Sequence, residues 1–236
     1  MPSSIIRSFD EKLPRSPHVM FTFKDNYREF RSSVSSTVAA NAVRVYIKED
    51  ISSLQGFAAR YLDLRLRPFS PLSEIMPALE RSHVLSTEAD VVRLSTLQLL
   101  HPVNIALQEF APSGTVVVCS SEKQGGQNSR FDIQWSLRSE DGRFLTTLAI
   151  LEVKNTHVVH KTDFTPAERT SETYEAGMQE AMKFAPQYTL LEGNAVWLSK
   201  QASKYSGICT DVAVFDWNAM FIFNFNGRDS TGRKKW

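Results

Sequence analysis

Three side chains with the chemistry of a hydrolytic site stand within residues 130–155, which read RFDIQWSLRSEDGRFLTTLAILEVKN. Asp132 is in the first of two apolar-rich runs, and Glu152 and Lys154 end the second. Two neighbouring carboxylates repel each other unless a cation compensates them. Oxygen ligands of this kind suit Mg²⁺ or Mn²⁺, which keep several waters and share other positions with substrate phosphate. Lys154 would orient or help to activate the attacking water and stabilise the phosphorane charge, so the set favours phosphodiester hydrolysis.

A hairpin must position these residues. The polar segment 139–143 contains Asp-Gly between runs rich in β-branched and aromatic residues, which is a hairpin signal. If the turn is odd in length and centred on Gly142, Asp132 lies opposite Glu152 and shares a face with Lys154. The opposite face is then almost wholly apolar, as a buried face requires. A shift of one residue would separate the carboxylates and mix the apolar sets.

This pattern resembles the PD-(D/E)XK nuclease superfamily, whose restriction-endonuclease-like core runs helix, three-stranded meander, helix, strand. The resemblance covers roughly residues 88–225 and matches Asp132, Glu152 and Lys154 to the family's aspartate, second acid and lysine. Phe131 stands where the family name has proline, which is not a ligand. The chain, including its segment 212–225, is also similar to fungal members that carry this core.

The resemblance implies further site residues. The Val153 carbonyl would add a metal ligand, and a glutamate on the helix before the meander is matched by Glu88, with Glu80 and Glu109 as rivals. Stabilisation of the first helical turn explains Glu88 equally well. On the helix after the third strand, Gln179 would face the site, although an exposed amide on a solvated surface is the competing interpretation. The predicted phosphate contacts are Lys161, Lys183, Lys200 and Lys204.

Hydrophobic periodicity and turn residues predict an α/β fold with a mixed central sheet of roughly five or six strands, flanked by helices. We expect a flexible lead-in over residues 1–18, a helical N-terminal extension over 19–85, the nuclease-like core over 86–225 and a flexible basic tail over 226–236. Helices are predicted over 33–48, 50–67, from 88 to 110, and from 165, or from a restart at Ser171, to 188. Strands are predicted over 114–119, in the hairpin, and over 194–198, 208–215 and 219–225.

Composition narrows the class of protein. A net charge of +1, with 42% hydrophobic and 22% charged residues, is ordinary for a globular protein and gives no global attraction to nucleic acid. The sequence has no eighteen-residue apolar run and no signal-peptide pattern, so we expect no membrane association and a location in the nucleus or cytoplasm.

The partner predicted from the motif is nucleic acid, with DNA favoured over RNA, and a homodimer is left open. Two alternatives remain at this stage. One is a nuclease-fold binding or effector domain that recognises protein or nucleic acid without cutting. The other is a solvated polar face on an edge hairpin.

Overall fold

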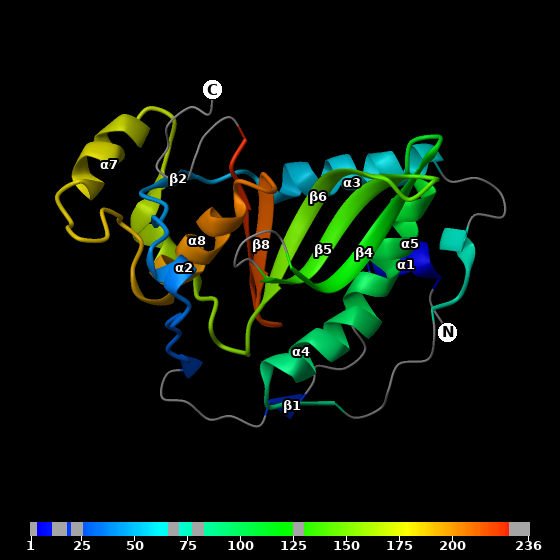
Figure 1. Cartoon of the computed structure of the whole chain (residues 1–236), viewed down its shortest axis with the longest axis horizontal. Helices are drawn as coiled ribbons and strands as arrows, with labels where there is room; N and C mark the ends of the chain where they lie inside the picture. The colour runs from blue at the N-terminus through cyan, green and yellow to red at the C-terminus, as the bar shows by residue number, and fades with distance from the viewer. Residues whose placement is uncertain are drawn as a thin grey trace. The chain divides into compact units, whose positions relative to one another are not determined.

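A mixed central sheet organises the chain. We describe it from a computed structural model, over residues 4–10, 18–19, 26–65, 71–76, 83–124 and 130–226. The central sheet has five strands in the order β4-β5-β6-β8-β9, and helices flank it (Figure 1). Its strands are β4 (Thr115–Gln124), β5 (Arg130–Ser139), β6 (Phe144–Val153), β8 (Asp211–Phe215) and β9 (Met220–Asn224). Since β8 pairs parallel with β6 and antiparallel with β9, the predicted α/β class and mixed sheet are confirmed.

Two compact units interleave along the chain. The first combines segments 1–21, 49–119 and 136–146, and the second combines 22–48, 120–135 and 147–236. Strands β4, β5 and β6 each pass from one unit to the other. We describe each unit by itself.

The first unit is mainly helical. Its elements are α1 (Ile5–Ser8), β1 (His18–Val19), α3 (Ile51–Arg65), η2 (Pro71–Ser73), β3 (Val84–Leu85), α4 (Glu88–Ser95), the π-helical η3 (Thr96–Leu100) and α5 (His101–Glu109). The predicted helix start near residue 87 is confirmed, because Thr87 and Asp90 form a reciprocal capping box. Pro102 lies in the first turn of α5, directly after the π-helical turn η3, where the helical hydrogen-bonding pattern changes.

The hairpin turn lies in the same unit. Gly142 N donates to Ser139 O at 2.9 Å, and Ser139 N donates to Arg143 O at 3.0 Å, which closes a three-residue loop. Gly142 has a φ of 87°, a conformation that glycine adopts without steric cost. The loop is odd in length as predicted, although it is centred on Asp141 rather than Gly142.

The second unit holds the rest of the sheet and the helices of its crossover. Its other elements are α2 (Ser35–Val38), β2 (Tyr46–Ile47), α6 (Lys161–Phe164), η4 (Thr165–Ala167), β7 (Glu168–Arg169), α7 (Tyr174–Ala181) and α8 (Gly193–Tyr205). Parallel strands need a long connection, and the segment between β6 and β8 supplies it. Helix α8 packs on β8, and its buried residues Leu198 and Ala202 join Ile150, Val212 and Val214 in one apolar core.

Several predicted elements are confirmed and others are wrong. Helix α3 corresponds to the predicted helix 50–67, and β8 and β9 form the predicted second hairpin. The predicted strand 194–198 is wrong, because these residues belong to α8. The predicted helix 33–48 is reduced to the short α2 followed by β2. Of the two starts predicted for the helix ending near residue 188, the one at 165 is only a 3-10 turn, and the restart at Ser171 lies close to the start of α7 at Tyr174.

Some predictions fall outside the described residues. These are Glu80 and residues 227–236 of the predicted tail. Among the helices of the described ranges, none combines the length and the apolar character needed to cross a membrane.

Candidate functional site

Glu152 and Lys154 form a buried ion pair at the end of β6. Lys154 Nζ lies 2.6 Å from Glu152 Oε1, and each residue is only 4% exposed. Strand β6 is an interior strand between β5 and β8. The interpretation of these residues as a solvated face on an edge hairpin is therefore wrong. Charges buried to this degree persist only when they are paired and hydrogen-bonded.

Asp132 on β5 reaches the same strand end. Its Oδ2 accepts a hydrogen bond from Val153 N at 2.8 Å, between the two other members of the predicted set. Asp132 is only partly buried, so its carboxylate retains access to solvent. The structure therefore brings the three motif residues together within one unit.

Helix α8 adds two polar side chains that hold Glu152. Gln201 and Tyr205 are four residues apart and so lie on one face of the helix. The Gln201 amide Nε2 donates to Glu152 Oε1, and Tyr205 OH donates to Glu152 Oε2 at 3.2 Å. The amide also donates to the Tyr205 hydroxyl at 3.3 Å, so the two side chains fix each other. Glu152 thus receives hydrogen bonds from three side chains.

The electrostatics keep Tyr205 in its neutral, donating form. Burial raises the pKa of its hydroxyl well above the ordinary value, and the nearby Glu152 and Asp132 carboxylates raise it further. Both carboxylates therefore lie close enough to act on one hydroxyl. A tyrosine that stays protonated can hold Glu152 without adding a third negative charge.

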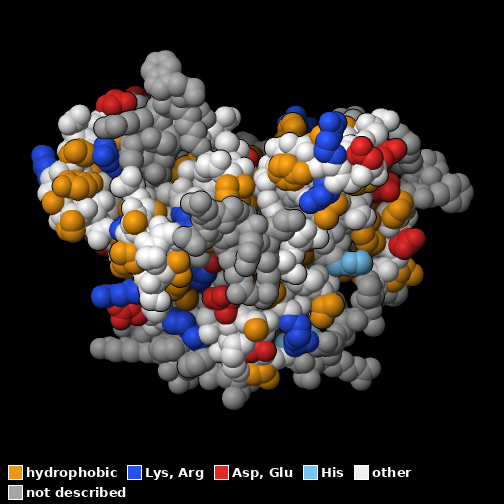
Figure 2. All heavy atoms as spheres, in the orientation of Figure 1, with side chains coloured by type: hydrophobic (Ala, Val, Ile, Leu, Met, Phe, Trp, Pro, Cys, Tyr) orange, Lys and Arg blue, Asp and Glu red, His pale blue; other side chains and the backbone are white. Residues whose placement is uncertain are grey.

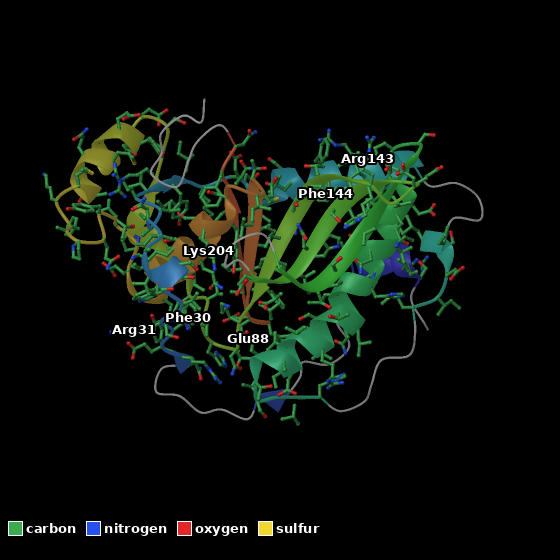
Figure 3. All side chains as sticks on the ribbon, in the orientation of Figure 1. Phe30, Arg31, Glu88, Arg143, Phe144 and Lys204 are labelled. Carbon is green, nitrogen blue, oxygen red and sulfur yellow. The ribbon has the colours of Figure 1, made fainter. Side chains whose placement is uncertain are left out.

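Two lysines face aromatic rings beside this cluster. Lys154 Nζ lies 5.3 Å from the centroid of the Phe30 ring, and Lys204 Nζ lies 5.4 Å from that of Tyr205. Burial lowers the pKa of Lys204, and the Glu152 carboxylate opposes that shift. Figure 3 shows Lys204 on α8 and Phe30 below α2. The cluster therefore combines two acids with two amines.

Hydrogen bonds join the ends of β6 and β8 next to this cluster. Lys154 N donates to Phe215 O at 2.7 Å, which continues the parallel pairing of the two strands. The next residue, Asp216, is fully buried and accepts four backbone hydrogen bonds, two from Val158 and Val159 and two from Asn218 and Ala219. One carboxylate thus joins the loop after β6 to the turn after β8.

The remaining predicted residues lie elsewhere. Glu88, in the first turn of α4, and Glu109, at the end of α5, belong to the first unit. Gln179 is exposed on α7, which stands away from β6 and β8 in Figure 1. The helical glutamine that contacts Glu152 is Gln201 instead.

The predicted phosphate-binding lysines differ in their surroundings. Lys161 opens α6 and Lys183 follows α7, and both are exposed. Lys200 is only 7% exposed and donates to Val38 O at 3.1 Å. Lys200 therefore binds the segment of α2 rather than facing open solvent, whereas Lys204 lies beside Glu152.

The sequence predicts neither Gln201 as a site residue nor the contact of Tyr205 with Glu152. The signal that could have found them is their spacing of four residues, with Lys204 between them, in a helix before a core strand. The strand predicted over residues 194–198 hides that signal, because it makes the segment 199–207 a loop.

The donor set fits a hard divalent cation. Two carboxylates lie at one strand end, and Gln201 Oε1 is buried without a hydrogen-bond partner among the described residues. A buried oxygen acceptor that lacks a donor is suited to a cation. Within the described ranges, no group of three or more His, Cys, Asp or Glu side chains could hold a metal ion. A cation here would complete its shell with amide or carbonyl oxygen, water or substrate.

Comparison with known proteins adds no relative. No protein-family model matches the chain, and neither a curated protein nor a solved structure does.

Proposed function

We propose that the protein is a nuclease that hydrolyses phosphodiester bonds with the help of Mg²⁺ or Mn²⁺. The observation that carries the proposal is the convergence of Asp132, Glu152 and Lys154 at the end of one strand pair, with Gln201 and Tyr205 holding Glu152 from α8.

The order of elements supports this proposal. A helical segment (α4 to α5) precedes the meander β4-β5-β6, and α8 then crosses over to the parallel strand β8. This is the order that the resemblance to the PD-(D/E)XK superfamily implies. The resemblance also implies a glutamine or lysine that faces the site from the crossover helix, and we infer that Gln201 and Lys204, rather than Gln179, have this role.

Each residue has a distinct role in this proposal. Asp132 and Glu152 would hold the cation, with the Val153 carbonyl as a further predicted ligand. When bound, the cation would polarise the phosphate and lower the pKa of a coordinated water. Lys154 would orient the water and stabilise charge on the phosphoryl oxygens while the water oxygen bonds to phosphorus and the bond to the leaving oxygen breaks. Gln201 and Tyr205 are positioning residues that act through Glu152.

The test combines metal binding with cleavage. Mg²⁺ and Mn²⁺ are titrated by calorimetry into the wild type and Glu152→Ala, while cleavage of single- and double-stranded DNA and RNA is followed. We expect Glu152→Ala to abolish metal binding and to lower cleavage by at least ~100-fold, since it removes a direct ligand. Gln201→Ala should weaken both by about 10-fold, because it removes a support of that ligand.

Gln179→Ala is the matched control, since it removes an exposed glutamine amide from the neighbouring helix α7. We expect this variant to cut like the wild type. A wild type that neither binds metal at millimolar concentration nor cuts any of the four substrates would refute the proposal.

A second function is favoured by one observation. Glu152 already receives hydrogen bonds from Lys154, Gln201 and Tyr205, so its charge is compensated by protein groups. Such a network could stabilise a nuclease-fold domain that binds protein or nucleic acid without cutting. Binding of nucleic acid that persists in EDTA, without cleavage in any metal, would support this alternative.

A further inference from the structure

A cavity of about 1010 Å³ opens beside the proposed site, in the same unit. Four of its lining side chains carry aromatic rings: Tyr27, Phe30, His160 and Trp197. The cavity lies at the upper end of the range of small-molecule pockets, which is about 300–1,000 Å³. It therefore has room for a nucleobase together with its sugar.

The aromatic wall is held in place by hydrogen bonds. Tyr27 OH donates to Asp163 Oδ2 at 2.7 Å, and Phe30 N donates to Asn194 Oδ1 at 2.8 Å. The Asn194 amide Nδ2 donates back to Arg28 O at 2.7 Å. The backbone of Arg28 and Phe30 is thus fixed to Asn194 of α8, and the Tyr27 hydroxyl is fixed to Asp163 of α6. A wall that is ordered before binding loses little conformational entropy when a ligand stacks on it.

The rings offer π faces at several points of the wall. Tyr27 and His160 stack with centroids 4.5 Å apart. Lys200 Nζ lies 5.3 Å from the centroid of Trp197, which helps to fix the indole. Tyr27, Phe30, His160 and Trp197 are each only partly buried, so part of each remains accessible.

Phe30 connects this cavity to the proposed catalytic lysine. The same ring lines the cavity and lies 5.3 Å from Lys154 Nζ. A nucleotide bound at the proposed site therefore has an adjacent aromatic surface for its own or the next base. Figure 3 shows Arg31 next to Phe30, and Arg31 also lines the cavity. Its only described ion pair, with Glu29 at 3.1 Å, is highly exposed and therefore weak.

We propose that this cavity binds an unpaired base of the nucleic acid strand next to the scissile phosphate, which makes the protein selective for single-stranded or extruded nucleotides. Bases stack on aromatic side chains only when their faces are free, whereas bases within a duplex are covered by their neighbours. This inference rests on the proposed nuclease function and specifies its substrate.

The test measures binding apart from cleavage. Fluorescence anisotropy in EDTA follows a labelled 12-nucleotide DNA strand, the RNA strand of the same sequence, and the DNA duplex. We expect the wild type to bind either single strand at least ~10-fold tighter than the duplex. Phe30→Ala and Trp197→Ala should each weaken single-strand binding by about 5- to 150-fold, the range for one stacked base.

Two variants control for unfolding and for general loss of aromatic surface. Trp197→Phe keeps a stacking ring and should retain most of the affinity. Phe184→Ala removes an exposed ring that follows α7 and does not line the cavity, and should bind like the wild type. Thermal denaturation of each variant accompanies the binding measurement.

An abasic nucleotide makes the test specific. An abasic residue replaces the base at each position of the strand in turn. We expect the wild type to bind more weakly at one of these positions. At that position the replacement should not weaken binding by Trp197→Ala any further. Equal binding of folded Trp197→Ala and wild type, or tighter binding of the duplex, would overturn the inference. A wild type that binds as expected but never cuts would refute the nuclease proposal alone.

Discussion

At the scale of single residues, the Glu152 carboxylate is the centre of the proposed site, because three side chains donate hydrogen bonds to it. The chemistry of the side chains, the alternation of the hairpin and the resemblance to a nuclease motif predict the set Asp132, Glu152 and Lys154, and the structure brings the three together. Gln201 and Tyr205 reach Glu152 only through the packing of a helix some fifty residues later in the chain. A sequence pattern records local periodicity and cannot show which helix face meets which strand end.

Tyr27 provides a prediction at this scale. Burial raises its pKa to about 12, and the hydrogen bond to Asp163 adds to the rise. Because the unfolded chain loses this proton near pH 10, the native state is favoured fully below pH 10 and loses this stabilisation as the pH rises towards 12. We expect the free energy of unfolding of the wild type to fall between pH 10 and 12 by about 1 kcal/mol more than that of Tyr27→Phe, allowing for solvent screening.

Urea denaturation at several pH values measures this difference. Tyr46, whose pKa burial also raises to about 12, contributes equally in both proteins and cancels in the comparison. Parallel curves for wild type and Tyr27→Phe over this interval would show that the Tyr27 hydroxyl is not stabilised in its neutral form.

At the scale of elements, strands with clear alternation were predictable and one helix was not. Residues 194–198 have the apolar content of a strand, yet they form the first half of α8. The start of that helix depends on Asp163, whose Oδ2 accepts from Asn194 N at 2.9 Å. A capping group thirty-one residues away in sequence leaves no local signal, unlike the capping box of Thr87 and Asp90, which was predictable.

The close packing at the start of α8 gives a prediction for Gly193. A Cβ atom at this position would lie 2.7 Å from Asp163 Oδ2 and would also clash with the Tyr27 hydroxyl, and the φ of +47° disfavours any side chain. We expect Gly193→Ala to lower the free energy of unfolding by about 1–3 kcal/mol. Thermal or urea denaturation measures the change.

Gly207, just after the same helix, is the matched control. A Cβ atom there would meet nothing within 4 Å, and its φ is not positive. Gly207→Ala should change stability by less than ~0.5 kcal/mol. Equal effects of the two substitutions would mean that the contacts of Gly193 do not determine how α8 begins.

At the scale of the whole molecule, charge limits how nucleic acid could bind. The net charge is +1, and on the face shown in Figure 2 the basic and acidic side chains of the described residues are interspersed. Such a surface gives little long-range attraction to phosphates. Binding must then rely on a few local amines and on stacking, which fits the proposed cavity better than a long electrostatic groove.

Salt dependence tests this conclusion. If only two or three phosphates are neutralised, log K for single-stranded DNA should fall against log salt with a slope of about −1.4 to −2.1. Arg31→Ala should make that slope shallower by about 0.7. The slope measured for Lys183→Ala shows whether the predicted phosphate contact after α7 exists. A wild-type slope steeper than about −4 would indicate an extensive basic interface and contradict this view.

The carboxylate of Asp216 has a consequence for the motions of this unit. Loop amides usually exchange their hydrogens with water quickly, because loops open often. Here the amides of Val158, Val159, Asn218 and Ala219 share one buried acceptor. Opening either loop breaks two bonds to the same carboxylate and leaves that charge poorly solvated. We therefore expect the amides of these two loops to exchange as slowly as those of the core, and the end of β6 next to Lys154 to be equally rigid.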